Sequence, residues 1–541
     1  MSANGLTCER RRRGIGRGRT PIAVLAIALL TLTLAGAGQR ASAAGQPTAS
    51  RSPVVHAERA GLRLGTEALM GRVALVASKP GLRWRIISVT TWAHARGLTL
   101  IPDWDTTRLA DGQYWLELDD HGRLSTQGLF IRNYTALSLA ASPLANASAG
   151  LDTRSTDARS VVAVFRERSY RPGETAVIDL QGRYRALLVE ILHVGPEQKP
   201  TVGNETIQGV PVGKPIRVLG APRSVRVVVG NWESGLYAAR LTSGGKVGFA
   251  PFVVRPRRLG EHRVAVVQPT NTWQAYNYRD ANGDGVPDTW YYTSNCHTVD
   301  ESRPFLDRGV PPHFRQYDLG FLHWLARSGK QVDMLSQDDL EHISGNRLAH
   351  LYRLIVFPGH HEYVTVAEYD AVQRYRDLGG NLAFLSANNF FYRVDRHGNT
   401  ITRIGRWRDL GRPEAALVGV EYFYWNVGRY HSRPYTIVGA GRTPWLFAGT
   451  GLKNGDSFGY FGIEVDGRTA ASPPQTQLLA RMPNAFGTGR PAEMTYYETR
   501  AGAHVFAAGG FTLGGLQSRR PEIAKFLGNM WDRLTVERAG L

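Results

Sequence analysis

Apolar and polar residues alternate in short runs over the first part of the chain, as at 83–89 and 114–118. A period of two predicts strands that bury one face and leave the other in water. Turn residues separate these runs. We therefore expect a small β-sandwich over residues 60–150.

The alternation resumes after an Ala- and Ser-rich stretch at 135–159. The runs lie at 161–165, 175–179, 186–191, 225–230, 235–241 and 248–254. This spacing of short strands is typical of immunoglobulin-like sandwiches. It predicts a second β-sandwich module over residues 151–258.

The pattern changes near residue 263, where fully apolar runs begin to alternate with amphipathic helices. Predicted strands lie at 264–269, 332–335, 354–357 and 382–386, and predicted helices at 321–328 and 366–378. Strands that are apolar throughout belong to parallel sheets covered by helices on both faces. We therefore expect residues 259–541 to form an α/β domain with a mostly parallel sheet, of the glutamine-amidotransferase or flavodoxin-like type.

The first residues form a segment typical of exported bacterial proteins. Arginines at 10–13 precede a mostly apolar stretch at 22–37, and small residues at 41–43 offer a cleavage signal. We expect a signal peptide over 1–43, a linker over 44–59, and a secreted or cell-envelope location without a membrane span after cleavage. An uncleaved membrane anchor is the alternative.

Composition adds two constraints. The chain has two cysteines, and only Cys296 would remain in the mature chain, which excludes an intrachain disulfide there. The formal net charge is +19, nearly all of it from scattered arginines that are densest at 255–258. Because no nucleic-acid-binding motif accompanies them, we do not expect a nucleic-acid partner, and a basic surface facing an anionic envelope is the simpler interpretation.

Polar residues follow the predicted parallel strands. In open parallel sheets, ligands bind beyond the carboxyl ends of the strands. His360 and Glu362 come directly after one strand, on a turn opened by Pro-Gly, and Asn388 follows the next strand. An imidazole and a carboxylate on one tight turn suit metal binding or acid–base chemistry. A purely structural turn pair is the alternative.

Residues 280–288 have the pattern of a calcium-binding loop. Asp280, Asn282, Asp284 and Asp288 supply oxygen side chains at positions 1, 3, 5 and 9, and Val286 offers a backbone carbonyl at position 7. The bidentate glutamate of position 12 is missing. We expect Ca²⁺ to bind here, and a plain Asn-Gly-Asp-Gly turn is the alternative.

Several short motifs follow one another between residues 230 and 535. They read WESGLY at 232–237, YN at 276–277, ESRP at 301–304, PGHHEY at 358–363, GGN at 379–381 and YYE at 496–498. In order and approximate spacing they resemble the C-terminal domain of the N,N-dimethylformamidase large (beta) subunit. The resemblance implies a hydrolase of small linear amides, acting with a small partner subunit or as a homo-oligomer.

The resemblance also implies a mononuclear ferric ion, Fe(III), bound by two tyrosinates and one glutamate. The corresponding residues are Tyr237, Tyr276 and Glu362. Three anionic oxygens suit a hard Lewis acid, which can polarise an amide carbonyl and lower the pKa of a bound water. Ordinary half-buried tyrosines are the alternative for Tyr237 and Tyr276.

Catalytic roles are implied for His360, Asn388 and Glu498. We expect Glu498 to act as general base, Asn388 to stabilise the oxyanion, and His360 to orient the reactants by hydrogen bonding. Glu498 precedes a hairpin-like turn, so a solvated turn residue is its alternative. The chain departs from the family pattern at His361 and Val364, which stand where the family commonly has Asp and Trp.

The sequence thus predicts an exported amide hydrolase that activates water with a ferric ion. The competing hypothesis is a calcium-stabilised envelope binding protein without catalytic activity.

Overall fold

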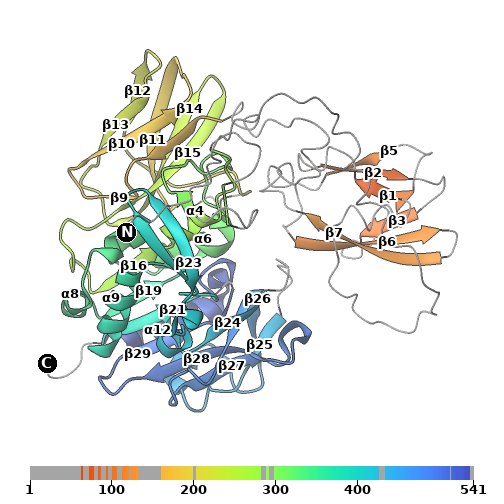
Figure 1. Ribbon diagram of the computed structural model, residues 1–541, viewed down its shortest axis with the longest axis vertical. Helices are drawn as coiled ribbons and strands as arrows, with labels where there is room; N and C mark the ends of the chain where they lie inside the picture. The colour runs from red at the N-terminus through yellow and green to blue at the C-terminus, as the bar shows by residue number, and fades with distance from the viewer. Residues whose placement is uncertain are drawn as a thin grey trace, which may run out of the picture. The chain divides into compact units, whose positions relative to one another are not determined.

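The computed structural model describes most of the chain beyond residue 159 and the strands between 62 and 131 (Figure 1). The fully described ranges are 160–198, 201, 203–281, 288–290, 298–425, 433–511, 513–515 and 518–536. The predicted signal peptide and linker, and Cys296, lie outside the described residues. The chain forms two compact units, Glu9–Asp152 and a second that holds Thr153–Leu541.

The first unit contains two antiparallel sheets. One has the strand order β1-β2-β5 and the other β4-β3-β6-β7. The strands are β1 (Leu62–Leu64), β2 (Arg72–Ala77), β3 (Arg83–Ile86), β4 (Ala93–His94), β5 (Leu100–Asp105), β6 (Gly112–Asp120) and β7 (Arg123–Ile131). Strand β3 covers the first four residues of the alternating run at 83–89, and β6 contains the run at 114–118, so the strand prediction is confirmed for 83–86 and 114–118.

The second unit begins with a β-sandwich whose two sheets have the orders β13-β10-β8 and β12-β11-β14-β15-β9. The strands are β8 (Val162–Phe165), β9 (Ser169–Tyr170), β10 (Thr175–Gln181), β11 (Ala186–His193), β12 (Val210–Leu219), β13 (Ser224–Val228), β14 (Gly235–Ser243) and β15 (Lys246–Val254). Inward-facing apolar side chains of both sheets form one core. Strand β12 was not predicted, because it is an edge strand with mostly exposed or half-exposed residues and therefore shows no alternation.

An 11-stranded mixed sheet follows in the same compact unit. Its parallel part has the order β18-β16-β19-β21-β29, with strands β16 (Val264–Gln268), β18 (Asp333–Ser336), β19 (Leu354–Phe357), β21 (Asn381–Phe384) and β29 (His504–Ala507). Antiparallel strands continue it: β24 (Glu421–Trp425), β25 (Arg433–Ile437), β26 (Ser457–Gly467), β27 (Gln477–Met482), β28 (Ala492–Glu498) and β30 (Gly510–Phe511).

The prediction of a mostly parallel sheet is therefore wrong for this second half. The multidomain, sheet-rich architecture is confirmed, whereas the likeness to glutamine amidotransferases or flavodoxins and the domain boundaries stay predictions. The apolar runs that revealed the parallel strands are buried on both faces, as in β16 and β19. The antiparallel strands carry bulges and irregular burial, which break any simple period.

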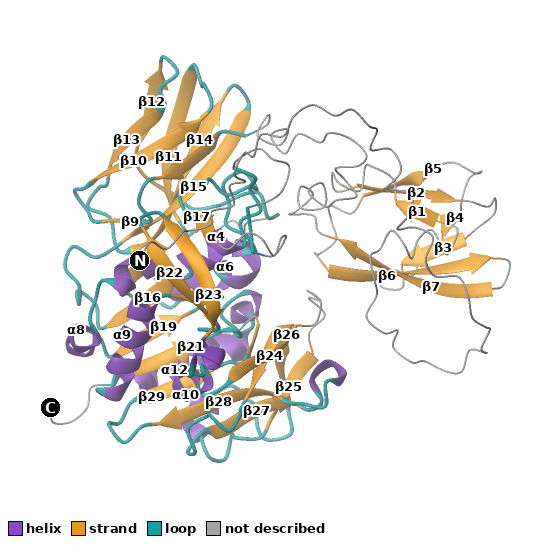
Figure 2. Ribbon diagram, in the orientation of Figure 1, coloured by secondary structure: helices purple, strands orange, loops and turns teal. Residues whose placement is uncertain are grey.

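Helices cover the parallel strands (Figure 2). They are α4 (Thr270–Ala275), α5 (Phe314–Tyr317), α6 (Leu319–Arg327), α7 (Gln337–Glu341), α8 (Gly345–Leu351), α9 (Val366–Asp377), α10 (Ala415–Val418), α11 (Pro444–Phe447) and α12 (Pro521–Thr535). A small sheet, β17-β23-β22-β20, is formed by β17 (Thr298–Asp300), β20 (Tyr363–Val364), β22 (Tyr392–His397) and β23 (Thr400–Arg406). Within the described ranges, every helix is too short or too polar to cross a lipid bilayer.

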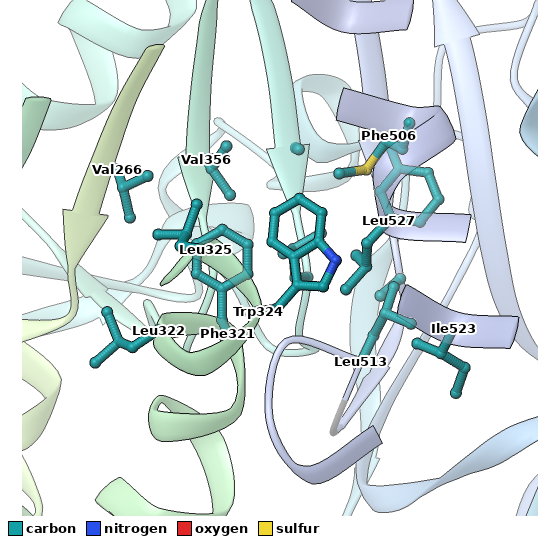
Figure 3. Close-up of a cluster of buried hydrophobic side chains, with 14 of the residues drawn as sticks. Val266, Phe321, Leu322, Trp324, Leu325, Val356, Phe506, Leu513, Ile523 and Leu527 are labelled. Atoms are coloured by element: carbon teal, nitrogen blue, oxygen red, sulfur yellow. The ribbon is translucent and has the colours of Figure 1, made fainter. Parts of the chain in front are cut away.

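Helices α6 and α12 pack on one side of the sheet in a continuous apolar core (Figure 3). Trp324 of α6 is buried among Phe321, Leu527 and the ring of Trp531, 5.7 Å away. Its indole N–H donates to the Ala524 carbonyl oxygen at 3.1 Å. Because the C-terminal helix covers part of the sheet core, the described fold is not complete without it.

Candidate functional site

Three segments that follow parallel strands meet at the carboxyl edge of the sheet. Strand β16 leads into α4, which ends at Tyr276. Strand β19 leads into the turn with His360 and Glu362, and β21 leads into Asn388. The edge predicted from the strand pattern is thus where these polar side chains gather.

Tyr276, His360 and Glu362 lie in direct contact. The Tyr276 hydroxyl donates to Glu362 Oε2 at 3.0 Å. His360 Nε2 is 3.5 Å from the same Glu362 oxygen and 3.2 Å from Glu464 Oε2 on β26. Both carboxylates and the imidazole are buried. His360 therefore stands between two carboxylates, and one of these also receives the tyrosine hydroxyl.

Asn388 is held next to this group by Asp466, two residues beyond Glu464. Its backbone N–H donates to both carboxylate oxygens of Asp466, at 2.9 and 3.1 Å. Its side-chain Oδ1 is buried and makes no hydrogen bond. A buried polar atom without a partner costs free energy, and such atoms often serve a bound group. Asn388 thus presents an unsatisfied amide oxygen at the sheet edge.

The backbone around these residues is strained. Asn388, Phe390 and His313 have positive φ angles of 54°, 60° and 59°, and Ile463 has a φ of 64°. A β-branched residue such as Ile463 rarely adopts this conformation. It immediately precedes Glu464, where β26 is irregular against β30. Strain of this kind is kept where the surrounding structure over-determines it, commonly at functional sites.

The electrostatics of the site are dominated by negative charge. Burial lowers the pKa of His360, but the nearby carboxylates of Glu464, Glu362 and Asp466 raise it, and the net direction is upward. Burial raises the pKa of Asp466 to about 8, against the opposing effect of the Asn388 N–H. The site therefore favours additional positive charge, either as protons or as a bound cation.

Aromatic rings form one wall of the site. The His360 ring lies 4.8 Å from Phe511 and 5.4 Å from Tyr276. A cavity of about 10 Å³ beside His360 and Tyr276 is bounded by Tyr317 and Asp318, and this is about the space that one water molecule requires. Burial raises the pKa of Asp318 to about 7, so a second group that can hold a proton borders the cavity.

The structure does not bring Tyr237 to this site, contrary to the ligand set predicted above. Tyr237 lies on β14 in the core of the β-sandwich. Its hydroxyl donates to the Glu233 carbonyl oxygen at 2.9 Å, and its ring stacks on His193 and Trp232. The WESGLY motif at 232–237 leads into the sandwich strand β14, so its position in the sequence, close to the α/β domain, does not place Tyr237 at the edge of the α/β sheet.

Glu498 is also remote from the site. It is the last residue of β28 and pairs with His504, the first residue of β29. That pair lies at the amino edge of the parallel strands, where the His504 N–H donates to the side chain of Asn381 at the start of β21. The Glu498 carboxylate is exposed and accepts from the Tyr496 hydroxyl at 2.6 Å. The structure therefore does not bring Glu498 to His360 and Glu362, and its role as general base stays a prediction.

The two departures from the family pattern do not alter the site. His361 points away from it: its Nε2 is 2.9 Å from the Val267 carbonyl oxygen, and burial lowers its pKa to about 3. Val364 is buried in the core on the other side of the turn. An extra charge from His361 beside Glu362 is therefore not expected near neutral pH.

The predicted calcium loop is only partly described. Asn282, Asp284 and Val286 lie outside the described residues. Asp288 is buried, and its Oδ2 accepts from the Ala281 N–H at 2.8 Å, which closes the loop that Asp280 opens. Calcium binding stays a prediction.

Sequence reasoning missed Glu464 and Asp466, and for Tyr422 it gave only an aromatic cluster that could line a pocket or pack in the core. Tyr422 pairs in register with Asp466 across β24 and β26, and its pKa is raised by burial and by the charges of Glu464 and Glu362. Glu464 and Asp466, two acidic residues inside the otherwise apolar run at 461–467, were a signal in the sequence, because buried carboxylates are rare without a function. The long β26 strand reaches the site from the antiparallel half of the sheet, which the strand pattern did not reveal.

Comparison with known families identifies one family model that matches a large part of the chain. The family described as N,N-dimethylformamidase beta subunit-like, C-terminal, matches residues 222–517, more than half of the 541 residues. The chain belongs to this family. The region matched by this dimethylformamidase-like family contains four residues of the site: His360, Glu362, Asn388 and Glu464.

Two curated relatives are the N,N-dimethylformamidase beta subunits of Alcaligenes sp and Paracoccus aminophilus. This dimethylformamidase-like chain is 30% identical to each over 146 residues, which cover 27% of this chain and 19% of each relative. The match thus spans about a fifth of the length of these relatives.

Two solved structures show weak similarity. An uncharacterized protein from Bacillus anthracis str. Ames is 17% identical with a TM-score of 0.13, over 17% of this chain and 80% of that chain. The N-terminal four Ig domains of Dscam1 isoform 4.44 are 11% identical with a TM-score of 0.11, over 35% of this chain and 41% of that chain. Similarities at this level carry no argument about fold.

A dimethylformamidase-like ferric site at this sheet edge would draw on Tyr276 and Glu362, the two predicted ligands that the structure brings together. Three buried carboxylates, of Glu362, Glu464 and Asp466, surround a single imidazole. Among the described residues, no group of three or more His, Cys, Asp or Glu side chains could hold a metal by itself. An ion here would need phenol oxygens as well, and a donor set of phenols and carboxylates suits a hard cation.

Proposed function

We propose that this chain hydrolyses the C–N bond of small linear amides and binds Fe(III) with Tyr276 and Glu362. The observation that carries the proposal is the contact of Tyr276, His360, Glu362 and Glu464 at one sheet edge of a dimethylformamidase-family chain. A bound ferric ion would supply Lewis acidity, which lowers the pKa of a water and polarises the amide carbonyl.

Glu464 and His360 are proposed to move the proton. The oxygen of water adds to the amide carbonyl carbon, and the released proton passes to the His360–Glu464 pair, whose atoms are 3.2 Å apart. The C–N bond then breaks, and the same proton is delivered to the leaving amine nitrogen. The products are a carboxylic acid and an amine. Glu464 thus takes the role of general base that the resemblance assigned to Glu498.

Asn388 is proposed to stabilise the negative charge that develops on the carbonyl oxygen. Its backbone is fixed by Asp466, so the side-chain amide is held without rearrangement. A preorganised donor in a buried site stabilises an oxyanion more strongly than water does, by about 3 kcal/mol in typical cases. The donor would be the side-chain Nδ2–H of Asn388, because an oxyanion accepts hydrogen bonds; the buried Oδ1, which makes no hydrogen bond, is itself an acceptor.

Tyr422 is proposed as the second phenol ligand in place of Tyr237. Residues paired in register on adjacent antiparallel strands share one face of the sheet, and Tyr422 is in register with Asp466, which faces the site. Its ring lies 5.1 Å from Phe391, whose backbone N–H donates to the Glu362 carbonyl oxygen. Tyr422 thus borders the same loop as Glu362.

The first test is the metal content and the visible spectrum of the full chain purified from iron-replete cells. We expect stoichiometric iron with a tyrosinate-to-Fe(III) charge-transfer band, together with hydrolysis of N,N-dimethylformamide or a related amide. The band should be lost in Tyr276→Phe, weakened and shifted in Tyr422→Phe, and unchanged in the matched control Tyr237→Phe.

Calcium alone, with no iron and no such band, would refute the proposal and favour the calcium-stabilised binding protein. A band that disappears in Tyr237→Phe but persists in Tyr422→Phe would refute only the assignment of the second phenol. Iron with an intact band but no hydrolysis of any amide would refute the activity and leave the metal site.

We also propose that the chain works with a partner subunit and is exported. The curated relatives are named as beta subunits, which supports a partner. The arginine-rich and apolar residues of the first segment support export. Co-purification of a small protein with the native chain, and the N-terminal sequence of the mature protein, would test the two points separately.

A further inference from the structure

A large cleft lies in the same compact unit, away from the candidate site, between the β-sandwich and helices α7 and α8. Its volume is about 980 Å³. The sandwich side is formed by the segment around β9 and by the arginine-rich segment after β15, and the other side by Asp338, Asp339 and Arg347. None of Tyr276, His360, Glu362, Asn388 and Glu464 lines it. The dimethylformamidase-like site therefore does not explain this cleft.

Two of the arginines that line the cleft fix its walls. Arg168 pairs with Asp338 at 3.0 Å, and Arg255 pairs with Asp339 at 2.8 Å. The Ser169 hydroxyl donates to the same Asp339 oxygen at 2.8 Å. Asp339 also caps the first turn of α7. These bonds join the sandwich to the α/β part, so the cleft is formed before any ligand binds.

The other arginines are not used for structure. The guanidinium groups of Arg171, Arg258 and Arg347 are exposed and have no recorded partner in the described part of the chain. Arg257 hydrogen-bonds only the neutral side chain of Asn231 there. Against these cations, Glu167 is the one lining carboxylate whose side chain has no recorded partner within the described ranges. The open face of the cleft therefore carries a clear excess of positive charge.

We infer that this cleft binds an acidic polysaccharide that carries repeated carboxylates. A guanidinium group matches a carboxylate in a bidentate geometry, and several exposed arginines in one cleft can engage successive acidic sugars. The volume of about 980 Å³ is at the upper end of small-molecule sites and suits an oligomer rather than a small amide. Glu167, Glu174 and Thr175 on the same wall can pair with sugar hydroxyls.

The lining favours a glycan over a nucleic acid. Proteins that bind single-stranded nucleic acid stack the bases on exposed aromatic rings. Tyr170 is the one Phe, Tyr or Trp among the described lining residues, and its ring is buried in the sandwich core while its hydroxyl accepts from the Glu167 N–H at 2.9 Å.

The test is calorimetric titration of the full chain with polygalacturonate at about 50 mM and about 500 mM NaCl, because exposed ion pairs are screened by salt. Dextran and single-stranded DNA serve as neutral and phosphate controls. The variant Arg171→Glu/Arg258→Glu/Arg347→Glu removes the unpaired cations of the cleft. The matched control Arg217→Glu/Arg223→Glu/Arg226→Glu makes the same charge change on exposed sandwich residues outside it.

We expect polygalacturonate to bind, more weakly at high salt, and the cleft variant to lose roughly tenfold or more in affinity, as three exposed ion pairs would give. The control variant should lose less than about threefold on the same grounds. An equal loss in both variants, no binding by the wild type, or binding of DNA as tight as polygalacturonate would overturn the inference. Far-UV circular dichroism establishes that each variant is folded, and the corresponding glutamine variants repeat the comparison without added negative charge.

Discussion

Glu368 lies fully buried at the start of α9, in contact with the helix that leads to Tyr276. Its carboxylate accepts from the Thr365 N–H at 2.7 Å, from Asn271 of α4 at 3.2 Å and from Gln337 at 3.0 Å. Burial nevertheless raises the pKa of Glu368 from 4.5 to about 8. Between these two pH values the folded chain keeps a proton that the unfolded chain has released. The free energy of unfolding should therefore fall as the pH rises from about 4.5 to about 8.

The size of this effect follows from the pKa difference. A rise from 4.5 to about 8 corresponds to at most about 5 kcal/mol, at 1.36 kcal/mol per pH unit. The effect of the N–H donors is already contained in this pKa, so between pH 5 and pH 8 we expect a loss of roughly 3–4 kcal/mol from Glu368. In Glu368→Gln the side chain no longer titrates, and this share of the pH dependence should disappear. Thermal midpoints measured at pH 5 and pH 8 would show it as a change of a few degrees in their difference.

Asp370→Asn is the matched control, because Asp370 is an exposed carboxylate on the same helix. It should leave the difference between the two midpoints as in the wild type. An identical pH dependence in Glu368→Gln and the wild type would refute the reasoning. It would mean that the three donors keep Glu368 charged in the folded chain, despite its burial.

Three further predictions concern the site and the core. Glu464→Gln should slow amide hydrolysis by roughly 10²–10⁴-fold, whereas Glu498→Gln should leave it nearly unchanged; equal rates in both would contradict the assignment of the base. Gly359→Ala should lower the free energy of unfolding by roughly 1–3 kcal/mol, because the new methyl group would lie 2.0 Å from Asp318 Oδ1. An unchanged midpoint of unfolding in urea would argue against this packing. Trp324→Ala should lower the free energy of unfolding by about 3–5 kcal/mol, since it removes a buried ring and its hydrogen bond to α12. A variant with the wild-type thermal midpoint would contradict the described packing of Trp324.

The parallel strands could be predicted because burial on both faces leaves an unmistakable apolar run. Strand β19 was predicted with its observed limits, and α9 to within one residue. The antiparallel half was not predicted, since a strand such as β26 mixes apolar residues with Glu464 and Asp466 and pairs irregularly with its neighbours. Local periodicity carries little information about strands whose partners and bulges are set by tertiary contacts.

The site could be predicted as far as it follows parallel strands. His360, Glu362 and Asn388 come directly after β19 and β21, so the topology of the sheet placed them at one edge. Tyr237 and Glu498 were placed by motif order alone, and the structure locates them on strands that point elsewhere. Order along the chain does not say which edge of a sheet a residue reaches. That depends on strand direction, which reverses between β29 and β28.

The limits of the family match do not coincide with the limits of a folding unit. The match begins at residue 222, just before β13, whose hydrogen-bonding partner β10 lies outside it. It ends at residue 517, before α12, whose buried Phe526 and Met530 complete the sheet core. A recombinant fragment cut at these limits would leave an unpaired strand and an uncovered apolar surface, and both promote aggregation. A fragment spanning 160–536 would retain the partner strand β10 and the covering helix α12. It is the shortest piece of the described chain that we expect to be expressed in soluble form.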